Sequence, residues 1–253
     1  MSSAKPQPSG MSWESFEGWK PAEICRRLRE VYGPIQPPPP EPVLDSLIRT
    51  VLSQHTSASG CQAAWANLRR RFPRWQAVLQ APMAELVRVI RPAGLAWQRA
   101  RTIRAILQEL QQLKAHQSDF SLDFLHDWPT EKALEYLLHF PGVGLKTAAC
   151  VLLFACGRPV LPVDTHVHRV AQRLGLLPAK CSASKAHQLL GQQVPARWIL
   201  EFHLQLIRHG RLTCLARRPR CRLCPLAAKC AFWRKIGEFR KNTTNRKAFS
   251  FGK

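Results

Sequence analysis

The chain has 253 residues, and its 38 lysines and arginines outnumber its 16 aspartates and glutamates to give a formal net charge of +22. Because 45% of the residues are apolar, this charge indicates a folded protein with a polyanionic partner and excludes a merely disordered basic tail. No hydrophobic signal segment is present, and the longest apolar run (148–156) is too short for a membrane span, so we expect a cytoplasmic, nucleoid-associated protein without membrane contact.

The first 42 residues divide into three parts. Residues 1–20 are polar and aperiodic, which predicts a disordered arm. Residues 22–32 have apolar positions at helical spacing and predict a short basic helix. The run Pro37–Pro40 then forms a polyproline spacer that a helix cannot cross.

From Val43 onward the pattern is helical almost without interruption. Apolar stripes recur within 44–52, 61–68, 86–90 and 100–113, and Arg99, Arg101 and Arg104 lie off the last stripe. Thr130 is a candidate N-cap for a helix that ends near Phe140. Because strand-like alternation does not persist anywhere, we predict an all-α fold with short connections.

A glycine-rich turn at 140–147 joins two of the predicted helices. Its central residues are expected to let the backbone approach a ligand and to direct amide groups outward: Gly142, Val143 and Gly144. Lys146 follows at the start of an apolar helix, where the helix dipole and partial desolvation disfavour the ammonium form. From spacing alone, Lys146 is either a nucleophile or an ordinary phosphate-binding lysine.

The segment Pro162–His166 opens a further helix, with Gly175 as its predicted stop. Asp164 is well placed to be the N-cap of this helix, although a carboxylate there could also stabilise a cation or relay a proton. His166 and His168 fall on different faces of the helix and do not form a metal pair. We interpret His166 as a histidine on the phosphate side.

Nine cysteines are present, and their odd number argues against a secreted disulfide scaffold. Four of them have the spacing C-x6-C-x2-C-x5-C: Cys214, Cys221, Cys224 and Cys230. A zinc ribbon normally uses two C-x2-C knuckles, whereas a single knuckle with unequal outer spacings favours a [4Fe–4S] cluster held by four thiolates. The alternative is four unrelated structural or free cysteines.

The segment that holds these four cysteines carries five cations and no acidic residue. Clipped by a metal, such a loop can bind a phosphate backbone. Arg217 and Arg218 are therefore predicted DNA contacts.

These motifs resemble the endonuclease III family of helix–hairpin–helix DNA glycosylases over roughly 42–230. The similarity rests on five stretches in the family order before the remaining cysteines: 52–57 (LSQHTS), 94–95 (GL), 140–148 (FPGVGLKTA), 163–166 (VDTH) and 209–214 (HGRLTC). The resemblance implies a six-helix barrel at 43–158 that contains the helix–hairpin–helix at 131–156. It also implies an iron–sulfur cluster domain from 21–42 and 159–230, a DNA groove between the two, and a basic tail at 231–253.

The resemblance further implies a monomeric repair enzyme that acts on damaged double-stranded DNA. Lys146 would attack the sugar of an oxidised pyrimidine and form a Schiff base, Asp164 would assist, and β-elimination would cut the strand 3′ to the abasic site. His55 stands where relatives often carry an amide that fills the gap of a flipped base, and Leu95 matches a wedge residue. Ala58 departs from a common aspartate. Leu95 could instead be a core leucine after a turn.

Two rival functions are considered. An adenine glycosylase shares the scaffold and cluster but lacks a lysine at the nucleophile position, which argues against it here. A catalytically silent DNA-binding protein with a redox or structural cluster belongs to a different class, and the presence of both Lys146 and Asp164 argues against it.

Overall fold

The computed structural model describes residues 18–113 and 120–237, and these residues form helices and loops without any strand. The all-α prediction is confirmed. Most of the predicted arm (1–17) and of the basic tail (238–253) lies outside the described residues. The α-helices are α1 (Pro21–Tyr32), α2 (Val43–Ser53), α3 (Ala58–Arg71), α4 (Trp75–Gln80), α5 (Met83–Ile90), α6 (Ala96–Leu113), α7 (Thr130–Leu138), α8 (Leu145–Phe154), α9 (Thr165–Leu174), α10 (Ala183–Gln193) and α11 (Ile199–Leu212).

Helix α9 shows how local sequence sets the bounds of an element. Asp164 is its N-cap, and the side chain accepts a hydrogen bond from the amide of Val167. Gly175 ends the helix in the left-handed conformation that glycine tolerates best. Between these ends an apolar stripe is buried, made of Val167, Val170, Ala171 and Leu174. The predicted cap and stop are both confirmed.

The prediction for Thr130 was wrong. Thr130 is the first residue of α7, and Pro129 occupies the capping position without a side-chain cap. The Thr130 hydroxyl instead accepts a hydrogen bond from Arg158 Nη1 at 3.1 Å. Since Pro has a backbone suited to a helix entry, the helix begins without the hydroxyl cap.

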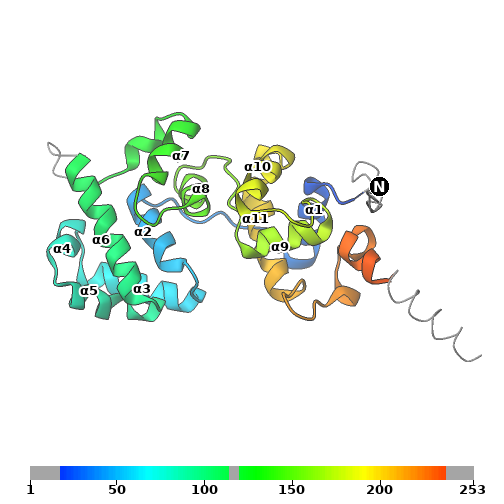
Figure 1. The fold of residues 1–253 in the computed structure, drawn as a ribbon, viewed down its shortest axis with the longest axis horizontal. Helices are drawn as coiled ribbons and strands as arrows, with labels where there is room; N and C mark the ends of the chain where they lie inside the picture. Colours follow the sequence, from blue (N-terminus) through cyan, green and yellow to red (C-terminus); the bar gives the residue numbers. More distant parts are fainter. Residues whose placement is uncertain (1–17, 114–119, 238–253) are drawn as a thin grey trace, which may run out of the picture.

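Two hydrophobic cores lie side by side along the molecule (Figure 1). The first is built from helices α2 to α8, and the second from α1, α9, α10 and α11. Helix α8 serves both cores, because Ala148, Val151 and Leu152 are buried in the first and Leu153 is buried in the second. This double burial explains why α8 is apolar on nearly all sides. The domain bounds given above remain a prediction.

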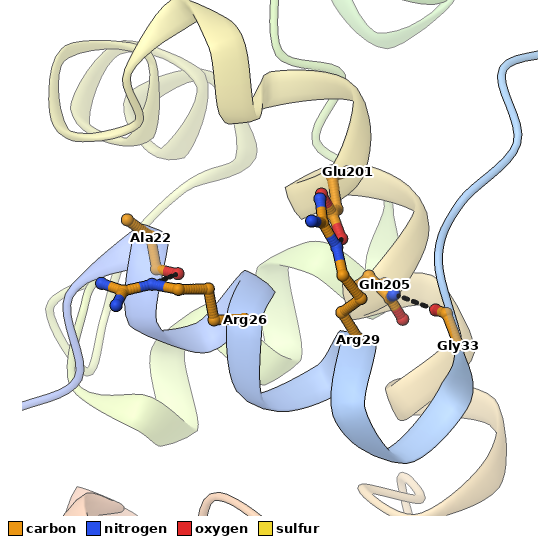
Figure 2. Close-up of polar contacts among 6 residues, drawn as sticks. All are labelled: Ala22, Arg26, Arg29, Gly33, Glu201 and Gln205. Carbon is orange, nitrogen blue, oxygen red and sulfur yellow. Dashed lines mark hydrogen bonds and ion pairs between the residues drawn. The ribbon is translucent and has the colours of Figure 1, made fainter.

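Helix α1 packs on α11, although the two lie far apart in the sequence (Figure 2). Arg29 donates through Nε to Glu201 Oε1 at 2.7 Å, and Gln205 Nε2 donates to the carbonyl of Gly33 at 2.9 Å. The chain then runs from α1 through the prolines to α2 in the other core (Figure 1). Among the described helices, none has the length and apolar character that crossing a membrane would require.

Candidate functional site

The turn before α8 approaches the rest of the first core closely. Gly142 has a φ of 74°, and a Cβ on it would lie 2.8 Å from Cγ2 of Thr102 on α6. Both the backbone conformation and the missing side chain are therefore required here. The turn before α8 therefore packs directly against Thr102 of α6.

The amides of this turn do not all point outward. The Val143 side chain is buried, and its N–H donates to the carbonyl of Phe140 at 3.1 Å. Gly144 is exposed and caps α8, whose first-turn N–H groups lack intrahelical partners. Gly144 and the residues after it can therefore offer amides to an anion. The predicted DNA contact of Val143 stays a prediction.

Lys146 is half-buried in the first turn of α8, at the junction of the two cores. Its neighbour Thr147 is buried, and Thr147 Oγ1 accepts a hydrogen bond from Gln54 Nε2 at 3.3 Å. One turn further on, Cys150 lies on the same helix face and is buried. Burial raises the pKa of the Cys150 thiol, and the nearby Lys146 ammonium opposes this change. The thiol next to the lysine is thus neutral.

Asp164 approaches the same place from α9. Its Oδ1 caps the helix by accepting a hydrogen bond from the Val167 amide at 2.7 Å. Its second oxygen accepts no hydrogen bond from the residues that the structure describes. The carboxylate acts electrostatically on both Cys150 and His203, the two groups that Lys146 also affects. Lys146 and Asp164 therefore both lie within electrostatic range of the same two buried groups, Cys150 and His203.

His203 of α11 is a member of this group that the sequence did not reveal. It is buried, and its Nδ1 lies 2.9 Å from the carbonyl of Pro162, two residues before Asp164. Burial lowers the pKa of His203 to about 4, against the opposing influence of Asp164, so the ring is neutral near neutral pH. Cys150 could have been found from its spacing to Lys146, whereas His203 depends on tertiary packing alone.

Two exposed residues project from loops that adjoin this part of the first core. His55 follows α2 with a φ of 49°, and Leu95 precedes α6 with a φ of 44°. Both angles are uncommon for residues with a side chain. Leu95 is 61% exposed, which rules out the alternative that it is a core leucine. His55 and Leu95 are thus free to meet a ligand.

All four predicted cluster cysteines line one pocket, which encloses about 360 Å³ with its solvent-open part included. No three His, Cys, Asp or Glu side chains among the described residues converge closely enough to hold a single metal ion. Four thiols that line one pocket fit a cube-shaped cluster, which takes one thiolate at each of its four irons. Burial, together with the charge of the other three cysteines, raises the pKa of Cys224 to about 11. Coordination would offset this, because it favours the thiolates.

Neighbouring side chains contact two of these sulfurs. Arg173 Nη1 donates to Cys214 Sγ at 3.3 Å and to the carbonyl of Leu215 at 2.7 Å. His209 Nε2 lies 3.6 Å from Cys224 Sγ, while its Nδ1 lies 2.9 Å from the Tyr32 hydroxyl. Burial lowers the pKa of His209 to about 4, so its ring is neutral near neutral pH. The single ring proton can serve either the Cys224 contact or the Tyr32 contact. Such outer contacts are typical of sites that fix metal ligands.

Helix α9 connects the pocket to the Lys146 site. Asp164 begins the helix, and Arg169 and Arg173 on its later turns hold the cysteine loop. Arg169 Nη2 donates to the carbonyl of Gly210 at 2.8 Å and to that of Cys214 at 3.1 Å. A disturbance in the cysteine loop would therefore be passed to the helix that positions Asp164.

The remaining predicted contacts lie around these features. His166 is half-buried against α11, where a Cβ on Gly210 would lie 2.9 Å from its Nδ1, and burial lowers its pKa. Arg217 and Arg218 are exposed on the cysteine loop, and Arg218 has a φ of 50°. Their exposure leaves both guanidinium groups available to phosphate.

Comparison with known proteins agrees with this arrangement. Residues 48–196 match the family described as HhH-GPD superfamily base excision DNA repair protein. A protein of Arabidopsis thaliana is 36% identical over 172 residues, or 68% of this chain, and the chain spans 58% of that protein's length. Endonuclease III of Rickettsia felis is 30% identical over 217 residues, which cover 84% of this chain and 96% of the relative.

The fold is also similar to a solved structure of a trapped endonuclease III–DNA covalent intermediate. The TM-score is 0.72 with 26% sequence identity, and the match covers 85% of this chain and 96% of that one. The chain therefore belongs to the HhH-GPD superfamily of base excision DNA repair proteins and, within it, to the endonuclease III family of DNA glycosylases.

Proposed function

We propose that the protein removes oxidised pyrimidines from duplex DNA and then cuts the strand at the resulting abasic site. The observation that carries this proposal is the position of Lys146, half-buried at the start of α8 and sharing its neighbours with Asp164. The solved relative trapped as a covalent complex with DNA supports an enzyme–DNA bond in this family.

In the first step, a bond from C1′ of the sugar to Lys146 replaces the bond from C1′ to the base. The damaged nucleotide leaves the stack, at a cost that a lesion reduces. Neutral Lys146 attacks C1′ of the sugar, and the bond from C1′ to the base breaks with its electron pair on the departing base. The carboxylate of Asp164 stabilises the positive charge that develops and moves protons to or from the reacting groups. Because Cys150 and His203 are neutral, neither stabilises this positive charge, and Asp164 is the group that does.

The second step cleaves the backbone. Loss of a proton from the lysine nitrogen and opening of the sugar give a Schiff base between Lys146 and C1′. This Schiff base acidifies the proton on C2′. Its removal breaks the bond from C3′ to oxygen, and the electron pair leaves with the phosphate. Hydrolysis of the Schiff base then frees Lys146.

DNA binding would use the turn at 142–144 and the basic cysteine loop, with the protein acting as a monomer at the nucleoid. The amides at the start of α8 and the exposed side chains of Arg217 and Arg218 are suited to phosphate. His166 would stand on the phosphate side near Asp164. The net charge of +22 gives long-range attraction to the same partner.

Cys214, Cys221, Cys224 and Cys230 would hold a [4Fe–4S] cluster. The cluster would supply covalent cross-linking of the loop, since no step above requires an electron. Arg173 and His209 would orient two of the ligands through the contacts already described. The cluster therefore supports the reaction through α9 and Asp164.

The proposal is tested by borohydride trapping on duplexes that contain thymine glycol, dihydrouracil, uracil or an abasic site. We expect base release and a trapped covalent complex with thymine glycol and with dihydrouracil, both of which lack the C5–C6 double bond, and a trapped complex with the abasic site. Duplex binding without any base release or trapping on the panel would show instead a catalytically silent DNA-binding protein.

Cys221→Ser is expected to remove both the bound iron and much of the soluble protein. The loop around the cysteines buries few side chains besides Leu226 and Cys230, so metal ligation and folding of this segment are coupled. The check is iron and sulfide content with the visible absorption of protein purified without oxygen. Cys181→Ser, at a half-buried cysteine outside the pocket, is the matched control and should keep its iron. Stoichiometric zinc without iron in the unaltered protein would contradict the cluster.

A further inference from the structure

The prediction that Arg99 lies off the apolar stripe of α6 was wrong: Arg99 is only 3% exposed and lies one turn before the buried Ile103, on the same helix face. The exposed Arg101 on the same helix behaves as a polar-face residue normally does. A guanidinium group is rarely buried without partners, because desolvation of the charge is costly. The burial of Arg99 therefore requires an explanation that neither the fold nor the reaction steps provide.

The partners of Arg99 are three backbone carbonyls from two different loops. Nη1 donates to the carbonyls of Ala93 and Gly94, and Nη2 donates to the carbonyl of Gln54. The third nitrogen, Nε, is buried without a partner in the described part of the chain. The Arg99 Nε–H thus has no hydrogen bond, while Nη1 and Nη2 join the two loops.

Each of these loops carries one of the exposed residues that the sequence predicted to probe DNA. Gln54 immediately precedes His55, and Gly94 immediately precedes Leu95. His55 and Leu95 both have positive φ angles, so their loop conformations need support from outside the loop. The guanidinium group of Arg99 supplies that support to both at once.

Two further contacts show that these loops form one unit with the start of α8. A Cβ on Gly60 would lie 2.6 Å from the carbonyl oxygen of Pro92, so the segment after His55 touches the segment before Leu95. The side chain of Gln54 donates to Thr147, the neighbour of Lys146. A displacement at Arg99 would therefore alter both probing loops and the link to the catalytic turn.

We propose that Arg99 is a positioning residue that holds the loops of His55 and Leu95 at a fixed separation and so sets the efficiency of base extrusion without touching DNA. This inference rests on the proposed glycosylase function. It predicts that Arg99 matters when a paired base must be removed from the stack, and matters little when the sugar already lacks a base.

The test compares Arg99→Met with Arg104→Met. Arg104 is also on α6, donates to the carbonyl of Ala81 in a loop without a probing residue, and likewise has a buried Nε without a partner in the described residues. Each variant loses guanidinium–carbonyl hydrogen bonds, three for Arg99 and one for Arg104 among the described residues, so the assays are compared at matched stability. Melting temperatures and hydrogen exchange of 54–57 and 93–96 accompany the assays.

We expect Arg99→Met to slow excision of a fully paired oxidised pyrimidine by about 10- to 100-fold in single-turnover assays, which is the scale expected for small misplacements. Cleavage of a preformed abasic duplex should stay near the unaltered rate, and exchange of the two loops should rise only in this variant. Arg104→Met should resemble the unaltered protein in both assays.

Equal loss in both assays, or paired-lesion excision at the rate of Arg104→Met, would overturn the role of Arg99. If Arg99→Met does not fold, Arg99→Lys supplies the same comparison, because lysine keeps the charge but carries all its donors on one nitrogen instead of on a planar fork that spans two loops. A failure of the proposed function looks different, since the unaltered protein would then release no base and form no trapped complex.

Discussion

Lys146→Gln is expected to abolish the borohydride-trapped complex and all strand cleavage. Glutamine keeps roughly the length and polarity of the side chain but has neither a nucleophilic amine nor a positive charge. The variant should still fold, because Lys146 is only half-buried. The neighbouring hydrogen bond from Gln54 to Thr147 does not involve the lysine and is kept. It should also still bind an abasic duplex, since the amides of the turn and Arg217 and Arg218 are unchanged. Trapping, cleavage and binding assays on one abasic duplex check these outcomes.

Lys132→Gln is the matched control for this prediction. Lys132 lies on α7, the other helix of the hairpin, with its Nζ 4.1 Å from the ring centroid of Trp128. Its loss removes one charge from the same motif but leaves the start of α8 intact. The control should trap and cleave normally. A trapped adduct formed by Lys146→Gln would end the assignment of the nucleophile.

Asp164→Asn is expected to slow base excision by about 10²- to 10⁴-fold, the usual range for a positioned acid–base group. Asparagine caps a helix almost as well as aspartate, so α9 and the stability of the protein should change little. Cleavage of a preformed abasic site should suffer less, because its aldehyde reacts with Lys146 without prior loss of a base. Single-turnover rates on thymine glycol and abasic duplexes separate the two effects.

Helix α10 offers a control for the loss of a helix cap without any change at the Lys146 site. Ser182 caps α10 and accepts from the amide of Lys185 at 3.2 Å, so Ser182→Ala should cost about 1 kcal/mol of stability without slowing excision. If Asp164 served only as a cap, Asp164→Asn would excise bases at nearly the normal rate.

Features coded by neighbouring residues were predicted well from the sequence. The apolar stripes indicated the helices, and the Asp164 cap and Gly175 stop follow from residues within one helix. The turn at 140–147 and the grouping of four cysteines were also visible, because their spacing is short. Thr130 was assigned wrongly as a cap because a proline at the preceding position starts the helix without one.

Two features that depend on distant segments were not predicted. His203 reaches the neighbourhood of Lys146 and Asp164 only because α11 packs on α9 and the His203 ring contacts Phe154 of α8, which no local pattern encodes. Arg99 was set off the apolar stripe because it is charged, although its spacing to Ile103 puts it on the buried face, where carbonyls of two loops accept its hydrogen bonds. The hydrogen-bond partners that allow a polar side chain to be buried are therefore the part of this site that periodicity cannot reveal.

The central claim is that Lys146 forms the covalent bond to DNA. The most direct measurement is peptide mass spectrometry of the unaltered protein after borohydride reduction on an abasic duplex. We predict one modified peptide, with the sugar remnant on the nitrogen of Lys146. A remnant on another lysine or on the terminal amine, or no remnant at all, would contradict the claim.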